Sequence, residues 1–213
     1  RPELTPNLFH NQPGRLADVL RNADLMRVNF GVFVLHTVQM AMWVAVPAML
    51  VQAGLPKAAH WHVYLPAVVL SFLAMGGLFA LERRGQLRAA LLAAIALVLA
   101  VQIGLGLLAG TGSAPTLWVL GGVLFVFFCG FNALEASQPS LVSRMAPASL
   151  RGAALGTYNT LQSLGLFAGG ALGGALVKWA GVPALFGVTS ALCALWLALG
   201  WGLRPVGRSI GGH

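Results

Sequence analysis

The sequence predicts an all-α membrane protein with six transmembrane helices, and three observations support this fold class. Of the 213 residues, 58% are apolar and only 8% are charged, whereas roughly 25% are charged in soluble domains. Between residues 28 and 203 the chain contains six apolar stretches of about bilayer-spanning length, and Glu135 is the only acidic residue inside them. All eleven arginines lie outside these stretches, in alternate connections or near the chain ends.

The region before the first span predicts a cytoplasmic linker, residues 1–26, that includes a short amphipathic helix. Residues 15–26 carry apolar side chains at helical spacing and charged side chains between them. Residues 27–205 are expected to form the six-helix transmembrane domain, and residues 206–213 a cytoplasmic tail.

The six spans are predicted near 28–52, 60–81, 89–109, 116–143, 153–177 and 182–203. Each should be helical, because lipid offers no hydrogen-bond partner to an open backbone. The third and sixth spans carry little polarity, namely Gln102 in one and Thr189 with Ser190 in the other. We therefore expect these two spans to face lipid, and the first, fourth and fifth to face a polar interior.

The placement of positive charge predicts the orientation of the chain. Arginines gather before the first span, in the second and fourth connections and after the sixth span, while the two lysines lie in other connections. Because cytoplasmic loops accumulate positive charge, both termini should be cytoplasmic. The net charge of +8 is therefore a signal of topology, and a nucleic-acid partner is not expected.

Glu135 is the first candidate for function. A carboxylate at the centre of a membrane helix costs about 2.5–3.5 kcal/mol even on insertion scales, so it persists where it is paired, hydrated or functional. His36 lies nine residues from Arg27, and Glu135 lies nine residues from Arg144. At about 1.5 Å per residue both reach the same depth, near the middle of the hydrocarbon core. We expect Glu135 and His36 to couple protons; the alternative is a hydrogen-bonded clasp between helices.

Further polar and aromatic side chains are predicted to line a substrate cavity at this depth. They lie on the first, fourth and fifth spans: Gln39, Trp43, Phe128, Asn132, Tyr158, Asn159 and Gln162. The alternative is that the amides only join helices and the aromatic rings only pack.

Small residues recur every four positions in the fifth span, at Gly165, Gly169 and Gly173. Such a repeat lets a neighbouring helix approach closely, so we expect these glycines to pack against another span. The chain contains no metalloprotease, nucleotide-binding or serine hydrolase motif. An enzyme is therefore not expected, and neither is a metal or cofactor.

Two loop motifs resemble those of the major facilitator superfamily of transporters. Arg151 and Gly152, preceded by Pro147, resemble the proline-arginine-glycine signature that opens the eleventh helix of these proteins. Glu82, Arg83 and Gly85 resemble a degenerate copy of the loop motif between helices eight and nine; the alternative is a glycine turn with flanking arginines.

A narrower resemblance is to the carboxyl half of the YajR-type drug efflux transporters. The residues that carry it are His60-Trp61-His62-Val63-Tyr64-Leu65, Leu35-His36 and Phe131-Asn132-Ala133-Leu134-Glu135-Ala136 with Pro139-Ser140. The resemblance implies six helices that form one half of the superfamily fold in a bacterial inner membrane. It also implies that helices seven, eight, ten and eleven line the central cavity.

The implied function is proton-coupled efflux of lipophilic small molecules by alternating access. The implied partners are the lipid bilayer, the small-molecule substrate, protons and either an amino-terminal six-helix half or a second copy of the chain. Two alternatives remain at this point: a self-contained protein that homodimerises into a carrier, and a structural or assembly protein of the membrane without transport activity.

Overall fold

The computed structural model describes residues 16–202, except for the side chains of Leu16, Asp18, Leu78, Phe79, Leu81 and Glu82. Within this part of the chain all regular structure is helical. The elements are α1 (Leu16–Arg21), α2 (Ala23–Gln52), the 3-10 turn η1 (Lys57–Ala59), α3 (Trp61–Arg83), α4 (Leu87–Gly110), α5 (Leu117–Met145), the 3-10 turn η2 (Ala148–Leu150) and α6 (Arg151–Trp201). Residues 1–15 of the predicted linker and the predicted tail, residues 206–213, lie outside the described residues.

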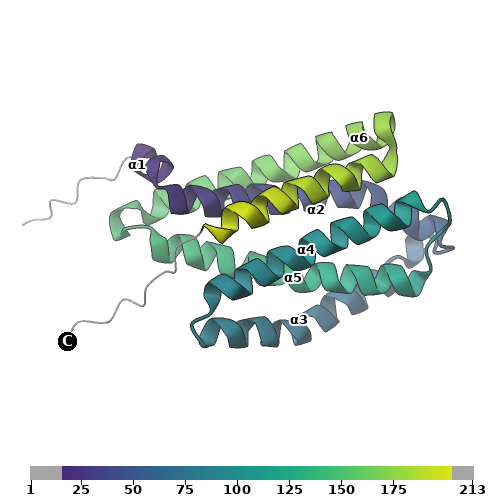
Figure 1. Cartoon of the computed structure of the whole chain (residues 1–213), viewed down its shortest axis with the longest axis horizontal. Helices are drawn as coiled ribbons and strands as arrows, with labels where there is room; N and C mark the ends of the chain where they lie inside the picture. The colour runs from purple at the N-terminus through teal and green to yellow at the C-terminus, as the bar shows by residue number, and fades with distance from the viewer. Residues whose placement is uncertain (1–15, 203–213) are drawn as a thin grey trace, which may run out of the picture.

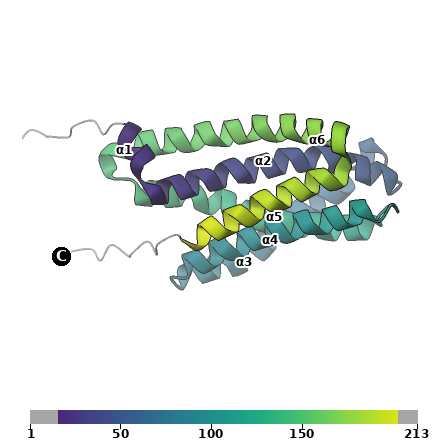
Figure 2. The same ribbon diagram turned by 45° about the horizontal axis from the view of Figure 1, so that its top comes forward.

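Five of these helical segments are long and apolar enough to cross a membrane. The predicted fifth and sixth spans both fall in α6, which is continuous apart from Gly181, where the backbone is not helical (φ 83°, ψ 169°). Glycine tolerates this left-handed φ, and Pro183 follows two residues later. Figures 1 and 2 show α6 running to one end of the molecule and turning back there.

The long helices pack as neighbours that lie roughly side by side (Figure 1). Helix α2 packs mainly on α6, α3 packs on α5, and α4 joins the two pairs by contacting both α5 and α6. A single apolar core runs between them, with Phe127, Phe186, Leu35 and Met42 among its fully buried side chains. This arrangement brings α2, α5 and α6 together around the candidate site.

The contact between α2 and α6 is close because glycines lie at it. A Cβ atom at Gly165 would lie 2.5 Å from the carbonyl oxygen of Phe33, and one at Gly173 would lie 2.9 Å from Cα of Ala41. A Cβ at Gly169 would also overlap α2. Glycine at these three buried positions therefore lets the two backbones approach as the repeat of small residues predicts.

The expectation that the third and sixth spans face lipid was wrong at their polar residues. Gln102 of α4 and Thr189 of α6 are both buried, and the Thr189 hydroxyl donates to Gln102 Oε1 at 2.9 Å. Gln102 Nε2 also lies 3.6 Å from Sδ of Met42 in α2. A polar side chain in an apolar helix is stabilised by a partner on another helix, so low polarity did not indicate low burial. In fact α3 is less buried than α4. Of an apolar stretch of 18 residues within Lys57–Gly77, 22% is buried, whereas 39% of such a stretch in α4 is buried.

The amino-terminal amphipathic stretch is divided into two helices. Helix α1 ends at Arg21, and Asn22 begins α2 because its side-chain oxygen accepts hydrogen bonds from the backbone N–H groups of Asp24 and Leu25. The predicted helix over residues 15–26 therefore continues into the first long helix after a change of direction.

The two loop motifs lie at the connections that they were predicted to occupy. Gly85 connects α3 to α4 with φ of +80°, a conformation that favours glycine, and Arg83 ends α3 with an exposed side chain. Nε of Arg151 donates to the carbonyl oxygen of Ser143 at 3.1 Å, which joins the start of α6 to the end of α5. Gly152 is exposed, and the Glu82 side chain lies outside the described residues.

Candidate functional site

Three side chains from three helices meet in one hydrogen-bonded cluster. Nε2 of His36 on α2 lies 3.2 Å from Oε2 of Glu135 on α5. Nε2 of Gln162 on α6 donates to Oε1 of Glu135 at 3.1 Å and lies 2.9 Å from Nε2 of His36. We call these three residues the His36–Gln162–Glu135 cluster. It brings together residues from three spans that the sequence placed at a similar depth.

The geometry of the cluster places a ring nitrogen of His36 beside a carboxyl oxygen of Glu135. Nδ1 of His36 lies 2.9 Å from the carbonyl oxygen of Val32, so Nδ1 carries a hydrogen and Nε2 of a neutral ring accepts. Oε2 of Glu135 is buried and has no hydrogen bond to another described residue. Oε2 and Nε2 of His36 lie within ion-pair distance, and an ion pair forms there only when the imidazole is protonated.

The orientation of the Gln162 amide depends on whether Nε2 of His36 carries a hydrogen. One hydrogen of its amide reaches Oε1 of Glu135 and the other reaches Nε2 of His36, which accepts when the imidazole is neutral. A proton on Nε2 would create two facing donors. The Gln162 amide would then have to rotate, so the two protonation states prefer different side-chain arrangements.

The two titratable groups differ in their access to the surroundings. The His36 side chain is 4% exposed and the Glu135 side chain is 37% exposed. The ring of Phe131 covers the imidazole from the side, with ring centroids 5.9 Å apart. The carboxyl group of Glu135 is therefore the more accessible of the two groups.

A second polar contact lies on α5 one turn before Glu135. Nδ2 of Asn132 donates to the hydroxyl oxygen of Ser71 on α3 at 2.9 Å, and that hydroxyl donates to the carbonyl oxygen of Val68. This contact holds Asn132 against α3. The contact also fixes the orientation of the Asn132 amide.

Aromatic rings lie further along the same helices. The rings of Trp43 and Tyr64 meet edge to face at 5.0 Å, and those of Trp43 and Phe128 lie 6.2 Å apart. They form a cluster that joins α2, α3 and α5. Edge-to-face pairs of this kind fix the orientation of a ring, so the indole of Trp43 is held between two helices.

The remaining predicted cavity residues are not all in contact with the cluster. Tyr158 is buried, and its hydroxyl has no hydrogen-bond partner among the described residues. Gln39 is half-buried. Asn159 is exposed, and its carbonyl oxygen accepts a hydrogen bond from Ser163 on the same helix. Asn159 therefore lies on the outer surface of α6 in the described structure.

Sequence reasoning did not include Ser71 among the candidates, although it holds Asn132. A signal was present, because Ser71 is the only hydroxyl-bearing residue of the Ser or Thr type between Trp61 and Arg83. A lone hydroxyl in an apolar span is stabilised by bonding to its own backbone, to another helix, or to both, as here.

Comparison with known proteins shows that the chain is similar to proteins that are named as transporters. The chain is 32% identical over 187 residues to the inner membrane transport protein YajR of Escherichia coli, a match of 87% of this chain and 40% of that protein. It is 28% identical over 156 residues to the uncharacterized transporter BU466 of Buchnera aphidicola, and 33% identical over 102 residues to the uncharacterized MFS-type transporter YhhS of Salmonella typhimurium.

The coverage of these matches is uneven. They cover 73% of this chain and 39% of the Buchnera protein, and 48% of this chain and 24% of the Salmonella protein. The chain therefore spans about two fifths of the length of the first two relatives. No protein-family model matches it.

Proposed function

Because this chain is related to the transporters of the major facilitator superfamily, we propose that it is the carboxyl-terminal half of a proton-coupled exporter. Its substrates are lipophilic small molecules, and it moves them by alternating access. The observation that carries the proposal is the His36–Gln162–Glu135 cluster, in which a titratable pair joins three helices. The proposed role is transport and not catalysis.

The proposed topology has six membrane crossings. Helix α6 has 51 residues and would be about 77 Å long if straight, which is far more than a ~30 Å hydrocarbon core. The turn at Gly181 divides it into two arms, and we propose that each arm crosses once. We propose that the α3–α4 and α5–α6 connections and both termini lie on the cytoplasmic side of a bacterial inner membrane, which the arginines at these two connections support.

Proton binding in the cluster supplies the proposed coupling. A neutral carboxyl group is stable in a closed, dry site, whereas a carboxylate favours a conformation that is open to water or to a cation. Gain and loss of the Glu135 proton therefore bias two conformations. His36 accepts or returns the proton, and Gln162 connects both groups to α6.

The proposed partner is a second six-helix unit. Large apolar side chains are exposed on α3 and on the first arm of α6, including Leu73 and Phe167 at 76% and 75% exposure. Polar residues such as Ser163 lie among them. This surface suits an amino-terminal half or a second copy of the chain, with the substrate between the two units.

The proposal is tested with the natural full-length protein in sealed vesicles that carry a pH-sensitive dye. Addition of a transported lipophilic compound should move protons across the membrane, and an imposed proton gradient should drive that compound against its concentration gradient. A protein that binds no lipophilic compound and moves no protons would favour the structural or assembly role instead.

A further inference from the structure

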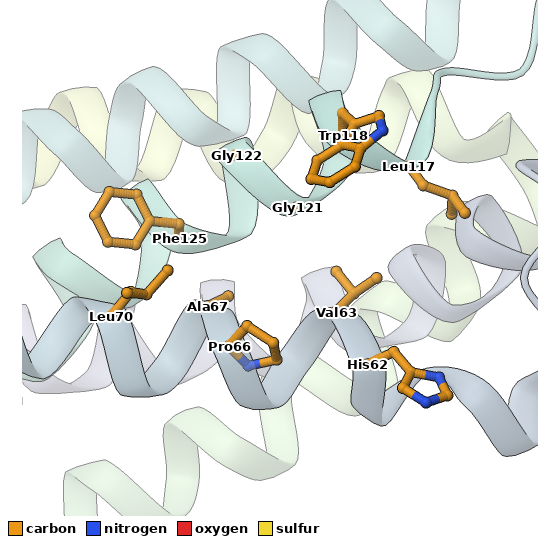
Figure 3. A pocket seen from close by; sticks show the side chains of 10 residues that line it. All are labelled: His62, Val63, Pro66, Ala67, Leu70, Leu117, Trp118, Gly121, Gly122 and Phe125. Atoms are coloured by element: carbon orange, nitrogen blue, oxygen red, sulfur yellow. The ribbon is translucent and has the colours of Figure 1, made fainter.

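An apolar pocket of about 540 Å³ lies between the first turns of α3 and the first turns of α5. Figure 3 shows Gly121 and Gly122 on α5 facing Val63 and Ala67 on α3 across it. The pocket is hollow because both glycines lack side chains. A Cβ atom at Gly122 would meet no other atom within 4 Å, and one at Gly121 would meet only Val63, at 3.7 Å.

Aromatic rings bound the pocket at its two ends. Phe125 and Leu70 lie at one end and Trp118 at the other (Figure 3). Trp118 is 92% exposed, so its indole ring is not needed to hold the helices together. Exposed aromatic surface beside a hollow of this size is typical of ligand sites, which range from about 300 to 1,000 Å³.

The pocket lies on the face of α5 that also carries Asn132. Trp118, Phe125 and Asn132 are spaced seven residues apart, so they lie on one side of the helix. Phe125 is ten residues from Glu135, which corresponds to about 15 Å along the axis. A compound in the pocket therefore lies on the side of α5 that faces α3, apart from the His36–Gln162–Glu135 cluster, which α5 forms with α2 and α6.

The lining selects for an uncharged ligand. It contains no Asp, Glu, Lys or Arg, and His62 is its only titratable side chain. Transfer of a charged group into such surroundings would be costly, because nothing in the lining pairs with it. Apolar and aromatic surface, in contrast, is buried there with a gain in free energy.

We propose that this α3–α5 pocket binds an uncharged, aromatic or otherwise lipophilic small molecule, and that it holds the apolar part of the transported substrate. This inference rests on the proposed transport function and names a site for the substrate. The pocket and the proton site are separate, so substrate binding and proton binding can be changed independently.

The experiment uses the natural full-length protein in lipid nanodiscs and an uncharged aromatic diazirine as photolabel. Labelled residues are mapped by mass spectrometry at increasing label concentration. A parallel sample contains a phospholipid with a diazirine in its acyl chain. The pocket-filling variant is Gly122→Leu, and Trp118→Ala removes one wall. The control is Gly104→Leu on α4, where a Cβ atom also meets nothing within 4 Å.

The proposal predicts saturable labelling by the free diazirine within residues 117–125. The label concentration that gives half-saturation should rise by about tenfold or more in Gly122→Leu and in Trp118→Ala, as expected for the loss of one large apolar contact. It should not change in Gly104→Leu. Non-saturable labelling equal to that of Leu107 on α4, whose side chain is 68% exposed, or saturable labelling by the phospholipid alone, would overturn the proposal. Saturable binding without any proton-driven transport would leave the pocket intact and refute the proposed function.

Discussion

Nε2 of His36 and Oε2 of Glu135 lie 3.2 Å apart across the contact between α2 and α5. The amide of Gln162 contacts both groups, although it is 126 residues from His36 and 27 residues from Glu135 in the sequence. The relationship joins the first, fourth and fifth predicted spans at one point. It therefore links the titratable pair to the packing of three helices.

Replacement of the bridging amide should weaken this link. Gln162→Leu removes both hydrogen bonds and leaves polar atoms of His36 and Glu135 without that partner. Each interhelical bond in a membrane contributes about 0.6 kcal/mol, with a maximum near 1.7, so the free energy of unfolding should fall by about 1–3 kcal/mol. Thermal unfolding in detergent measures this loss. Ser163→Ala, an exposed neighbour on the same helix, should cost less than about 0.5 kcal/mol; an equal loss in both variants would contradict the account.

The close contact between α2 and α6 predicts opposite effects at two adjacent glycines. Gly169→Ala places a Cβ against the α2 backbone at Thr37, whereas Gly170→Ala places one in open space. The first change should therefore destabilise the protein by about 1–3 kcal/mol through overpacking. The second should be neutral or stabilising by up to about 1 kcal/mol, since alanine is the better helix former. Melting temperatures of the two variants measure the difference, and similar values would show that α2 and α6 do not approach at Gly169.

The buried hydrogen bond from Thr189 to Gln102 predicts a positive coupling between α6 and α4. Thr189→Val leaves Gln102 Oε1 without its donor and should cost about 1–2 kcal/mol of unfolding free energy. The double variant with Gln102→Leu should recover part of this loss, because both polar groups are then absent. A double-mutant cycle gives the coupling directly. Strictly additive losses would mean that the two side chains do not bond.

The arginine distribution predicts that the two ends of α4 lie on opposite sides of the membrane. Cysteine at Ser113 should react with an impermeant maleimide added outside intact cells, and cysteine at Gln86 should react only after the cells are opened. The native Cys129 and Cys193 are buried, so the unmodified protein serves as the control. Labelling of both introduced cysteines from outside would refute the proposed topology.

Much of the fold was predictable because lipid leaves few choices to an apolar segment. The bounds of α3, α4 and α5 lie within two residues of the predicted spans. Distance from a flanking arginine likewise placed His36, Glu135 and Gln162 at one depth, and these three side chains are bonded in the structure.

Other features were not predictable from local sequence. Gln102 and Thr189 lie in spans with almost no other polarity, and only the packing of α4 on α6 shows that they bond to each other. Ser71 was missed for the same reason, since its partner Asn132 is 61 residues away. The separation of the predicted fifth and sixth spans, in contrast, was visible in the sequence, because Gly181 and Pro183 follow each other closely there; the backbone is not helical at Gly181, and α6 changes direction at that residue.

The most direct test of the account is proton-driven transport by Glu135→Gln in the natural full-length protein, reconstituted in vesicles with an imposed proton gradient. Glutamine keeps the size and much of the hydrogen bonding of the protonated acid but cannot release a proton. The variant should bind substrate and lose roughly nine tenths or more of the gradient-driven movement, as expected for removal of a positioned proton-transfer group. Asn132→Ala, by comparison, should mainly weaken substrate binding. Transport by Glu135→Gln at the normal rate and with the normal pH dependence would contradict the account and leave Glu135 as a structural clasp.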